Sequence, residues 1–561
     1  MALTKAHSRM IEGSIVNVKD FGAVGDGVTD DTTAVQLAFN QAGNIIIDGN
    51  FVITSKIQVL SNSNITQTKG SYIKNTDTTE TTIGGRPSTD NGVFEVACGE
   101  TNITFDGIDI RGAWYGLTQP YRDNNIGINI KGRWDQYRLS ETITGTSKNI
   151  LIKECLIEGF AQSGIIADQI DTFKALNNKI SKCGRDGIRM YGCVDFLCDG
   201  NTINSMSPGY DGVAPNLNVY GISATTVYQQ PLSDYRSSER GIITNNTVTD
   251  CLTWKSLDTH GGRDIVFSEN TCLNSHIGIG IDKGGLDNNG DYMPATRLVV
   301  SNNIIRNTQT DQAYKRAGIT VFAHSNTSAT IGQDVNIVGN YIDGFGGDTK
   351  DGGISLSHQK NVLISGNIIK NSINSAIYLA LTCEAVVISN NNIRNVALSG
   401  VGNKQGIGTS SLVGDVVISS NSFQADTTPF QPINIDPSSN NSIKYSGSNI
   451  SINCDEVGGW DYSNGGVNAE TIAYGLVLSS GATSSGYKIS STRVSLGRYD
   501  VTISGGPWTK LFPALSLFTG TTTAGSISLR NVSGDVITVM TFDSTGAKAD
   551  TAFYLQVNGY K

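Results

Sequence analysis

The sequence contains few charged residues, few prolines and no long hydrophobic run. Only 16% of its 561 residues are charged, and it has 11 prolines and 5 histidines. No stretch reaches the roughly 18 consecutive apolar residues of a membrane-spanning helix, and the opening MALTKAHSRM lacks the apolar core of a secretory signal. We therefore expect synthesis in a cytoplasm, with neither membrane insertion nor export by the secretory route.

Basic charge and paired cysteines are also scarce. The formal net charge is −9, the pI is near 5.2, and no basic stripe with interleaved aromatic residues occurs, so no nucleic-acid partner is expected. The nine cysteines are odd in number and show neither CxxC nor Cys/His metal-ligand spacing. This pattern predicts reduced, packed thiols, and we expect neither a metal nor a cofactor.

Glycine is abundant, with 64 residues, and an asparagine recurs in a repeating context. Each repeat alternates β-branched and small polar residues, with Gly and Asn where the chain must turn through positive φ. The asparagines are Asn178, Asn201, Asn246, Asn270, Asn303, Asn340, Asn367, Asn391 and Asn421. Their steps of 23, 45, 24, 33, 37, 27, 24 and 30 residues fit a coil of three short strands and three turns with insertions. This predicts an all-β protein, a right-handed parallel β-helix.

The recurring asparagines have a structural explanation. Stacked coils would place each asparagine above the previous one, and side-chain amides in that arrangement can form a hydrogen-bonded ladder. The repeat therefore predicts the architecture and does not by itself predict an active site.

A helix is predicted near the amino terminus, from residue 32 to 42, with Thr29 or Asp30 as its cap and Gly43 as its stop. The end of a solenoid exposes unpaired strand edges and an apolar cross-section, so we expect this helix to cover the first coil. Its apolar face consists of Ala34, Val35, Ala38 and Phe39.

Four regions follow from these patterns. Residues 1–15 form a short leader, 16–44 the cap, 45–462 the β-helix and 463–561 a carboxy-terminal domain. In the last region strand alternation continues without the asparagine period, and SGD and STG turns occur. We expect an antiparallel β-sandwich there.

The segment DFGAVGDGVTDDTTAVQLAF resembles the opening of pectate-lyase-like β-helix proteins, and with MALTKAHSRMIEG it resembles bacteriophage tailspikes. Tailspikes are typically homotrimeric enzymes that bind and cut capsular or O-antigen polysaccharide. The resemblance implies a homotrimer, a place in the virion tail, and a carboxy-terminal domain for trimerisation or carbohydrate binding. It also implies attachment to the phage tail or an adaptor protein through residues 1–15.

One strand of each coil offers candidate catalytic residues. If its isoleucines point inward, the residues one and three positions later face solvent. This alignment places Asp258 and Asp282, one 24-residue coil apart, in the outermost column, with Cα atoms about 4.8 Å apart. Repulsion between such carboxylates raises one pKa, which leaves an acid beside a base, as glycoside hydrolysis requires.

The longest insertions lie between Asn201 and Asn340 and predict loops that wall a lateral groove. Glu239, in one such loop, is the candidate third carboxylate. Aromatic faces stack on sugar rings, and charged groups bond hydroxyls. The predicted substrate-binding residues are Arg189, Tyr191, Tyr235, Trp254, His260 and Lys283.

Two other functions use the same surface. A polysaccharide lyase would need a base such as His260, Lys283 or Tyr191, and a cation such as Arg189 or a metal to neutralise a uronate. A non-catalytic adhesin would hold the glycan without cutting it. The aspartates also have an ordinary interpretation as solvated side chains held by Lys283 and Arg263. We favour hydrolysis because carboxylates outnumber bases in the outward columns.

Overall fold

The structure, a computed structural model, covers most of the chain. It describes residues 15–77, 81–83, 86–88, 92–113, 125–132, 145–204, 218–226, 236–286, 291–310, 316–324, 330–346, 352–396, 405–410, 413–426, 430–434, 444–446, 449–452 and the strands between 473 and 560. Two compact units make up the chain, residues 1–362 and 363–561.

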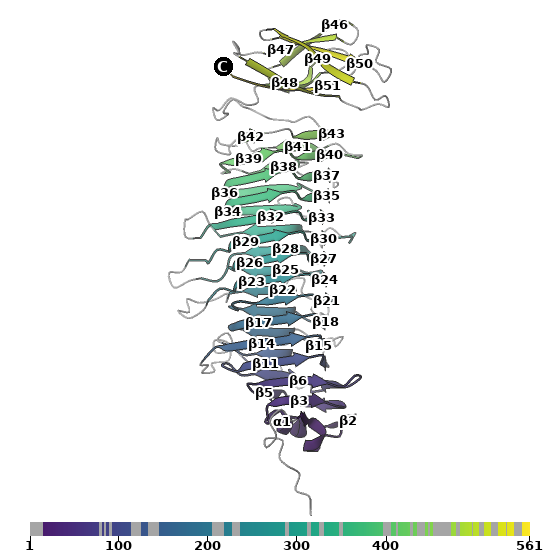
Figure 1. The fold of residues 1–561 in the computed structure, drawn as a ribbon, viewed down its shortest axis with the longest axis vertical. Helices are drawn as coiled ribbons and strands as arrows, with labels where there is room; N and C mark the ends of the chain where they lie inside the picture. Colours follow the sequence, from purple (N-terminus) through teal and green to yellow (C-terminus); the bar gives the residue numbers. More distant parts are fainter. Residues whose placement is uncertain are drawn as a thin grey trace, which may run out of the picture. The chain divides into compact units, whose positions relative to one another are not determined.

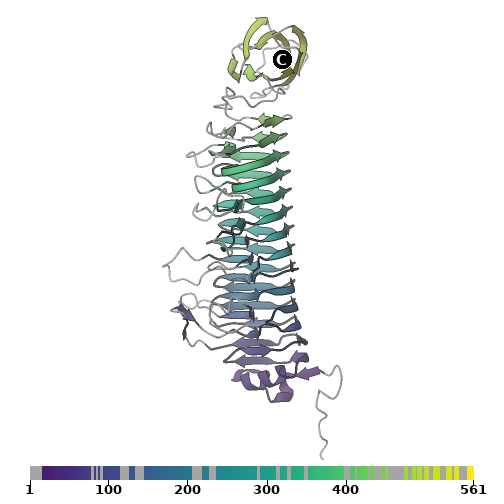
Figure 2. The ribbon, with the colours of Figure 1, turned by 90° about the vertical axis from the view of Figure 1, so that its left-hand side faces the viewer.

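The first unit is a parallel β-helix whose strands stack in three walls (Figures 1 and 2), as the sequence predicts. The first wall contains β5 (Ile57–Val59), β10 (Phe94–Val96), β13 (Ile126–Ile130), β16 (Ser163–Asp168), β19 (Asp186–Tyr191), β22 (Tyr220–Thr225), β25 (Lys255–His260), β28 (Ile277–Asp282), β31 (Ala317–Phe322) and the start of β34 (Ile354–Ser365). The second contains β1 (Ile15–Asn17), β3 (Gly43–Ile47), β6 (Ser63–Gln67), β11 (Thr101–Asp106), β14 (Ser147–Lys153), β17 (Ile170–Leu176), β20 (Leu197–Asp199), β23 (Glu239–Thr244), β26 (Arg263–Ser268), β29 (Thr296–Ser301) and β32 (Gly332–Val338). The third contains β2 (Asp26–Asp30), β4 (Asn50–Ile53), β7 (Tyr72–Asn75), β12 (Asp109–Arg111), β15 (Leu156–Phe160), β18 (Lys179–Cys183), β21 (Thr202–Asn204), β24 (Thr247–Thr249), β27 (Thr271–Leu273), β30 (Ile304–Arg306) and β33 (Tyr341–Asp343). A separate hairpin pairs β8 (Thr81–Ile83) with β9 (Arg86–Ser88).

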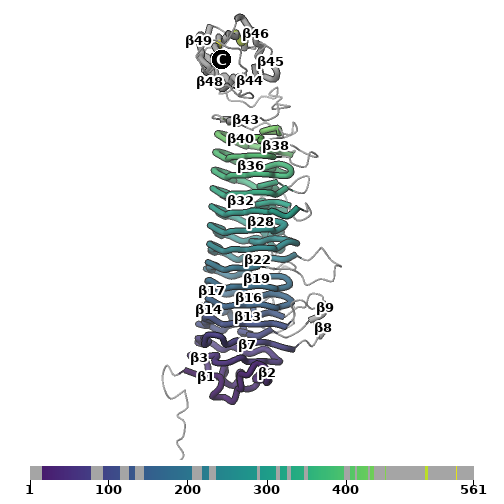
Figure 3. The backbone as a smooth tube through the Cα atoms, turned by 90° about the vertical axis from the view of Figure 1, so that its right-hand side faces the viewer, coloured from purple at the N-terminus to yellow at the C-terminus, as the bar shows by residue number. Residues whose placement is uncertain are grey.

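Apolar side chains from successive coils form columns inside the helix. On the first wall, Ile188, Ile222, Leu257, Ile279 and Ile319 are partners in register, and each is fully buried. The tube in Figure 3 shows these coils in succession. Register partners in successive coils therefore point to the same side of the wall, so an inward side chain in one coil lies next to an inward side chain in the next.

The predicted asparagine ladder is confirmed. Asn270 Oδ1 accepts hydrogen bonds from the backbone N–H and from Nδ2 of Asn246, both at 3.0 Å. Asn270 Nδ2 donates to the carbonyl of Ile243 and to Oδ1 of Asn303, both at 2.9 Å. Each buried amide thus satisfies backbone groups of the turn beside it, where water cannot reach them. Similar bonds connect each asparagine of the ladder to the asparagine of the next coil. In the first unit the ladder runs through Asn178, Asn201, Asn246, Asn270, Asn303 and Asn340, and in the second unit through Asn367, Asn391, Asn421 and Asn449.

A second column, at the start of the second wall, consists of residues with left-handed backbone conformations. In its middle the side chains alternate in charge: Asp195, Arg240, Asp264 and Arg297 have φ between 52° and 55°. Arg240 Nε lies 2.7 Å from Asp195, and Arg297 Nε lies 2.6 Å from Asp264. Hydrogen bonds from these arginines lower the pKa values of both aspartates. The column ties neighbouring coils together on the outside of the helix.

The capping helix is also confirmed. It forms α1 (Thr32–Phe39) after a short 3-10 turn, η2 (Val18–Phe21), and buries Val35, Ala38 and Phe39. The Phe39 ring stacks on Phe94, with centroids 5.5 Å apart, and so covers the interior of the first coils. The helix is three residues shorter than predicted, because a turn precedes Gly43, which begins β3. The predicted cap, Thr29 or Asp30, is wrong: the N-cap residue is Asp31, whose carboxylate accepts hydrogen bonds from the backbone of Val24 and Gly25.

The thiols are as predicted. Eight cysteines lie in described positions, all are free, and all but Cys98 are buried. Burial raises the pKa of Cys155, Cys183, Cys193 and Cys272 to about 12, so these thiols are unreactive near neutral pH. Within the described part of the chain, no helix is long and apolar enough to cross a membrane.

The second unit begins with further coils and ends in antiparallel strands. The coils contain β35 (Ile368–Ser372), β36 (Ile377–Ser389), β37 (Asn392–Val396), β38 (Gln405–Thr409), β39 (Val416–Ser419), β40 (Ser422–Gln424), β41 (Gln431–Asn434), β42 (Lys444–Ser446) and β43 (Ile450–Ile452). Two four-stranded antiparallel sheets follow, built from β44 (Ala473–Val477), β45 (Thr483–Tyr487), β46 (Ile489–Ser495), β47 (Arg498–Ile503), β48 (Lys510–Leu517), β49 (Ser526–Ser533), β50 (Val536–Phe542) and β51 (Phe553–Tyr560). The sandwich packing of these sheets, the four domain boundaries and the trimer remain predictions.

The ladder gives the first testable prediction. Asn270→Ala removes the acceptor of the Asn246 backbone N–H and the donor to the Ile243 carbonyl, and leaves both groups buried. We expect the free energy of unfolding to fall by about 2–5 kcal/mol. Guanidinium unfolding curves, followed by tryptophan fluorescence, measure this change.

Asn245→Gly is the matched control. The neighbouring Asn245 is exposed, its φ of 54° suits glycine, and its side-chain amide donates to Asp199 Oδ1 at the surface. We expect a change of about 0.5 kcal/mol or less. Equal losses in the two variants would contradict a special role for the buried ladder.

Candidate functional site

The register of β25 and β28 differs from the predicted one. Asp258 lies opposite Gly280, and His260 lies opposite Asp282. Asp258 and Asp282 are therefore not direct neighbours in one column, and that prediction is wrong. The physical reason is Leu257, which is the inward residue of KSLDTH and fills the core between Ile222 and Ile279. The predicted alignment matched Asp258 of this coil with Asp282. Aligning the coil on its core residue Leu257 moves it by two residues, so that His260 matches Asp282.

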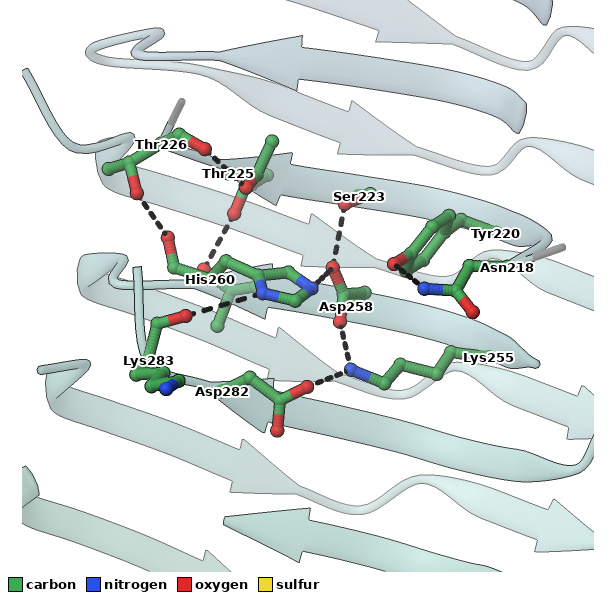
Figure 4. Close-up of polar contacts among 12 residues, drawn as sticks. Asn218, Tyr220, Ser223, Thr225, Thr226, Lys255, Asp258, His260, Asp282 and Lys283 are labelled. Carbon is green, nitrogen blue, oxygen red and sulfur yellow. Dashed lines mark hydrogen bonds and ion pairs between the residues drawn. The ribbon is translucent and has the colours of Figure 1, made fainter. Parts of the chain in front are cut away.

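Lys255 nevertheless joins the two aspartates (Figure 4). Its Nζ lies 2.6 Å from Asp258 Oδ1 and also donates a hydrogen bond to Asp282 Oδ2. The Lys255 side chain reaches Asp282 across Gly280, where a Cβ would overlap its Cδ, Cε and Nζ atoms. Absence of a side chain at position 280 is therefore what lets the ammonium group lie between the carboxylates.

Asp258 is a fully buried carboxylate with three polar groups around it. Ser223 Oγ donates a hydrogen bond at 2.8 Å and Lys255 Nζ donates one at 2.6 Å, while His260 Nε2 lies 3.2 Å from Oδ2. Burial alone would raise the pKa of Asp258, but the charges of His260 and Lys255 more than offset it, and the pKa is lowered. The folded-state pKa thus lies below the unfolded value of about 4, so this contribution to stability is present above about pH 4 and is lost in stronger acid.

Lys255 is a buried cation. Burial acts to lower its pKa, but Asp258 and Asp282 raise it above the ordinary value. The ammonium cancels the repulsion that we expected between the carboxylates. The pair therefore does not divide into an acid and a base in the way predicted, because Asp258 remains ionised.

His260 lies between two acceptors. Its Nε2 faces Asp258 Oδ2 at 3.2 Å, and its Nδ1 faces the carbonyl oxygen of Lys283 at 3.3 Å. Each ring nitrogen therefore faces an acceptor oxygen. Tyr220 packs its ring edge-on against the imidazole, with centroids 6.2 Å apart.

Asp282 is the member of this group that reaches solvent. Its side chain is 20% exposed, whereas that of Asp258 is 0% exposed. Ligand atoms of Asp258, His260 and Asp282 lie within 4.8 Å of one another, a spacing that a metal ion could use. However, Lys255 Nζ bonds both carboxylates, so a cation already lies between them. We name Ser223, Lys255, Asp258, His260 and Asp282 the Lys255 cluster.

Arg189 and Tyr191 lie on the same wall, two coils before Asp258, and both are only 4% exposed. Arg189 forms an ion pair with Asp186 at 3.2 Å, and its guanidinium lies 4.6 Å from the ring centroid of Tyr220. The structure therefore places these two predicted sugar-binding residues in a buried polar layer that continues into the Lys255 cluster. Their contact with substrate remains untested.

Trp254 and Lys283 lie at opposite ends of the site strands. Trp254 immediately precedes β25, and its half-buried ring stacks on His276, with centroids 5.8 Å apart. Lys283 immediately follows β28, and its Nζ lies 3.4 Å from the ring centroid of Tyr292. Both predicted binding residues thus flank the Lys255 cluster.

Two other candidates are not brought to the cluster. Glu239 is the first residue of β23 on the second wall, where it pairs in register with Arg263 and bonds Arg240 Nη1 at 2.9 Å. Its expected position in a loop over the first wall is wrong, because ERGIIT is a strand with Ile243 in the core. Tyr235 lies outside the described residues.

Sequence reasoning missed Lys255 and the role of Gly280. The available signal was the departure of this coil from its neighbours, since a lysine occupies the strand position that holds Tyr220 and Ile277 in adjacent coils.

No protein-family model and no curated protein matches the chain. Among solved structures, it is similar to the Dettilon tailspike protein, with 14% identity, coverage of 97% of this chain and 94% of that chain, and a TM-score of 0.46. It is also similar to a mutant tailspike protein of E. coli bacteriophage HK620 in complex with a pentasaccharide, with 12% identity, 97% and 93% coverage, and a TM-score of 0.45. A third similar structure is a Yersinia enterocolitica Family 28 exopolygalacturonase, with 12% identity, 79% coverage of each chain and a TM-score of 0.43. The β-helix itself is established by the strand pairing described above.

The contact across Gly280 gives the second prediction. Gly280→Ala places a methyl group in the volume of the Lys255 side chain. We expect a loss of about 1–3 kcal/mol in the free energy of unfolding, because a buried, ion-paired side chain must move. Thr320→Ala, one coil further in the same column, is the control and should be nearly neutral. Wild-type stability of the Gly280 variant would contradict the described path of Lys255.

Proposed function

We propose that this protein is a phage tailspike that binds bacterial surface polysaccharide, capsule or O-antigen, and depolymerises it by hydrolysis of glycosidic bonds. The observation that carries the proposal is the Lys255 cluster. Buried charges destabilise the folded state unless their partners compensate for the lost hydration. A buried Lys–Asp–His network therefore marks a candidate functional site. The sequence resemblance of the amino-terminal segment to tailspikes supports the substrate class.

The exposure of the cluster members suggests their roles. Asp282, whose carboxylate accepts a hydrogen bond from the Lys255 ammonium, is the proposed base, which takes a proton from the water that attacks the anomeric carbon. His260, the register partner of Asp282, is the proposed acid. Its 3.3 Å contact with the Lys283 carbonyl is long, so a glycosidic oxygen can replace that acceptor and receive the proton. Asp258, which is fully buried and accepts hydrogen bonds from Ser223 and Lys255, is a positioning residue.

The second wall supports the proposed homotrimer. Leu197, Ile242, Val266 and Val299 follow one another in register on its outer side, and Ile242 is 45% exposed. An outward apolar column of this kind suits burial against a second copy of the chain. We propose attachment to the phage tail or an adaptor through residues 1–15, which lie almost entirely outside the described residues, and hence a location in the virion.

A polysaccharide lyase is the second candidate, and one observation favours it. His260 is held by an ionised carboxylate and contacts the backbone of Lys283, whose side chain is a cation. In β-elimination a base removes the proton at C5 of a uronate, the oxygen at C4 leaves, and a 4,5 double bond forms. His260 would be that base, and Lys283 would neutralise the uronate carboxylate.

Substitution of Asp282 tests catalysis. Asp282→Asn retains an oxygen that can accept the Lys255 hydrogen bond but removes the base. We expect the rate of polysaccharide cleavage, measured as new reducing ends, to fall by about 10²–10⁴-fold with glycan binding retained.

Asp264→Asn is the control, since Asp264 is an exposed, ion-paired aspartate on the second wall. It should cleave at the wild-type rate. Full activity of the Asp282 variant would remove this residue from the mechanism. Absence of cleavage by the wild-type protein on every glycan that it binds would instead favour the adhesin.

The products distinguish the two enzymatic mechanisms. Hydrolysis should yield reducing ends without a new ultraviolet absorbance, whereas β-elimination produces an unsaturated, absorbing bond with each cut. Recording both signals on the same digest decides between them. An absorbance that rises in step with reducing ends would contradict the hydrolytic proposal and support the lyase.

A further inference from the structure

We infer that Lys283, Tyr292 and His324 form a subsite for a sugar that carries a carboxylate, so that the glycan bound beside the Lys255 cluster is acidic. This inference rests on the proposed function and adds the chemical class of the substrate. It depends on a hairpin that follows β28, on a cation fixed by an aromatic ring, and on the position of that cation next to His260.

The hairpin begins directly after Asp282. Gly284 N–H donates to the Met293 carbonyl at 2.7 Å, Met293 N–H donates to the Gly285 carbonyl at 3.0 Å, and Leu286 bridges Tyr292 in antiparallel fashion. These bonds bring Tyr292 back beside Lys283.

The base of the hairpin is fixed to the coils before it. Gly285 N–H donates to Thr226 Oγ1 at 3.1 Å, and Thr226 Oγ1 donates to the His260 carbonyl at 3.2 Å. Gly261 and Gly284 approach closely, since a Cβ on Gly261 would overlap the Gly284 backbone and a Cβ on Gly284 would overlap Thr226 Oγ1. The hairpin is therefore held against the coil that carries His260.

The ammonium group of Lys283 lies against an aromatic ring. Its Nζ lies 3.4 Å from the Tyr292 ring centroid, and the Tyr292 and His324 rings are 4.1 Å apart at 40°. In the part of the chain that the structure describes, Lys283 forms no ion pair with a carboxylate. A cation–π contact orders the side chain but leaves the positive charge unneutralised, so binding of an anion costs less conformational entropy.

The position of this cation is what links it to the proposed reaction. The Lys283 carbonyl contacts His260 Nδ1 at 3.3 Å, and the preceding Asp282 is already neutralised by Lys255. A sugar over this strand end would meet a positive group where the rest of the protein, with a net charge of −9, disfavours anions. Such a local cation is what recognition of a charged sugar requires.

Carboxyl reduction combined with substitution tests the subsite. The full-length protein is applied to arrayed capsular and O-antigen oligosaccharides, both acidic and neutral, and bound acidic glycans are tested again after carbodiimide–borohydride reduction of carboxylate to alcohol. We expect wild-type protein to bind carboxylate-bearing glycans and to lose roughly 10–100-fold in affinity on their reduction, as for one charge-assisted hydrogen bond. The Lys283→Gln variant should bind the native glycan with an affinity lower than that of the wild type by the same factor. Reduction of the glycan should not lower the affinity of this variant further.

Lys179→Gln is the matched control, because Lys179 is an exposed lysine on the third wall, away from the proposed trimer interface. It should bind like the wild type. Uronate and nonulosonate glycans form separate arms, which distinguish the source of the carboxylate. Binding restricted to neutral glycans, no binding to any acidic glycan, or wild-type affinity of the Lys283 variant would overturn the inference. These assays need no turnover, so they are independent of cleavage by Asp282.

Discussion

The register between successive coils is the constraint on which the rest of the structure depends. Inward side chains such as Leu257 and Ile279 set this register, and the buried asparagine amides hold it at every turn. The Lys255 cluster exists only in this register, because Lys255 must pass over a glycine to reach an aspartate of the next coil. A slip of one residue would turn each of these side chains to the other face.

Charge balance determines how the cluster can act. One ammonium lies between two carboxylates, and an imidazole contacts the more buried of them. Burial of any one charged member alone would destabilise the folded state, yet together the members keep Asp258 ionised. Within the cluster, only Asp282 is partly exposed to solvent. The same arrangement separates the roles of the two aspartates, since a carboxylate saturated with donors orients a neighbour while an exposed one can meet substrate.

Much of the fold could be predicted from the sequence because its signals are local and repeated. The asparagine period, the apolar face that includes Val35 and Phe39, and the unpaired cysteines each depend on short-range patterns. The site was predicted only in part. Asp258, His260 and Asp282 do lie together, but a two-residue strand period places position 255 on the same side as the inward Leu257, and so it does not reveal that Lys255 Nζ bonds Asp258. Glu239 was misplaced because the length of an insertion does not reveal where its last residues rejoin a wall.

The alternating charges on the second wall have an evolutionary consequence. Asp195, Arg240, Asp264 and Arg297 come from four successive coils, and opposite charges attract each other along this run. Duplication of a single coil within this run would stack two aspartates or two arginines, whereas duplication of two coils would preserve the alternation. This stretch of the solenoid is therefore expected to lengthen or shorten over time by even numbers of repeats.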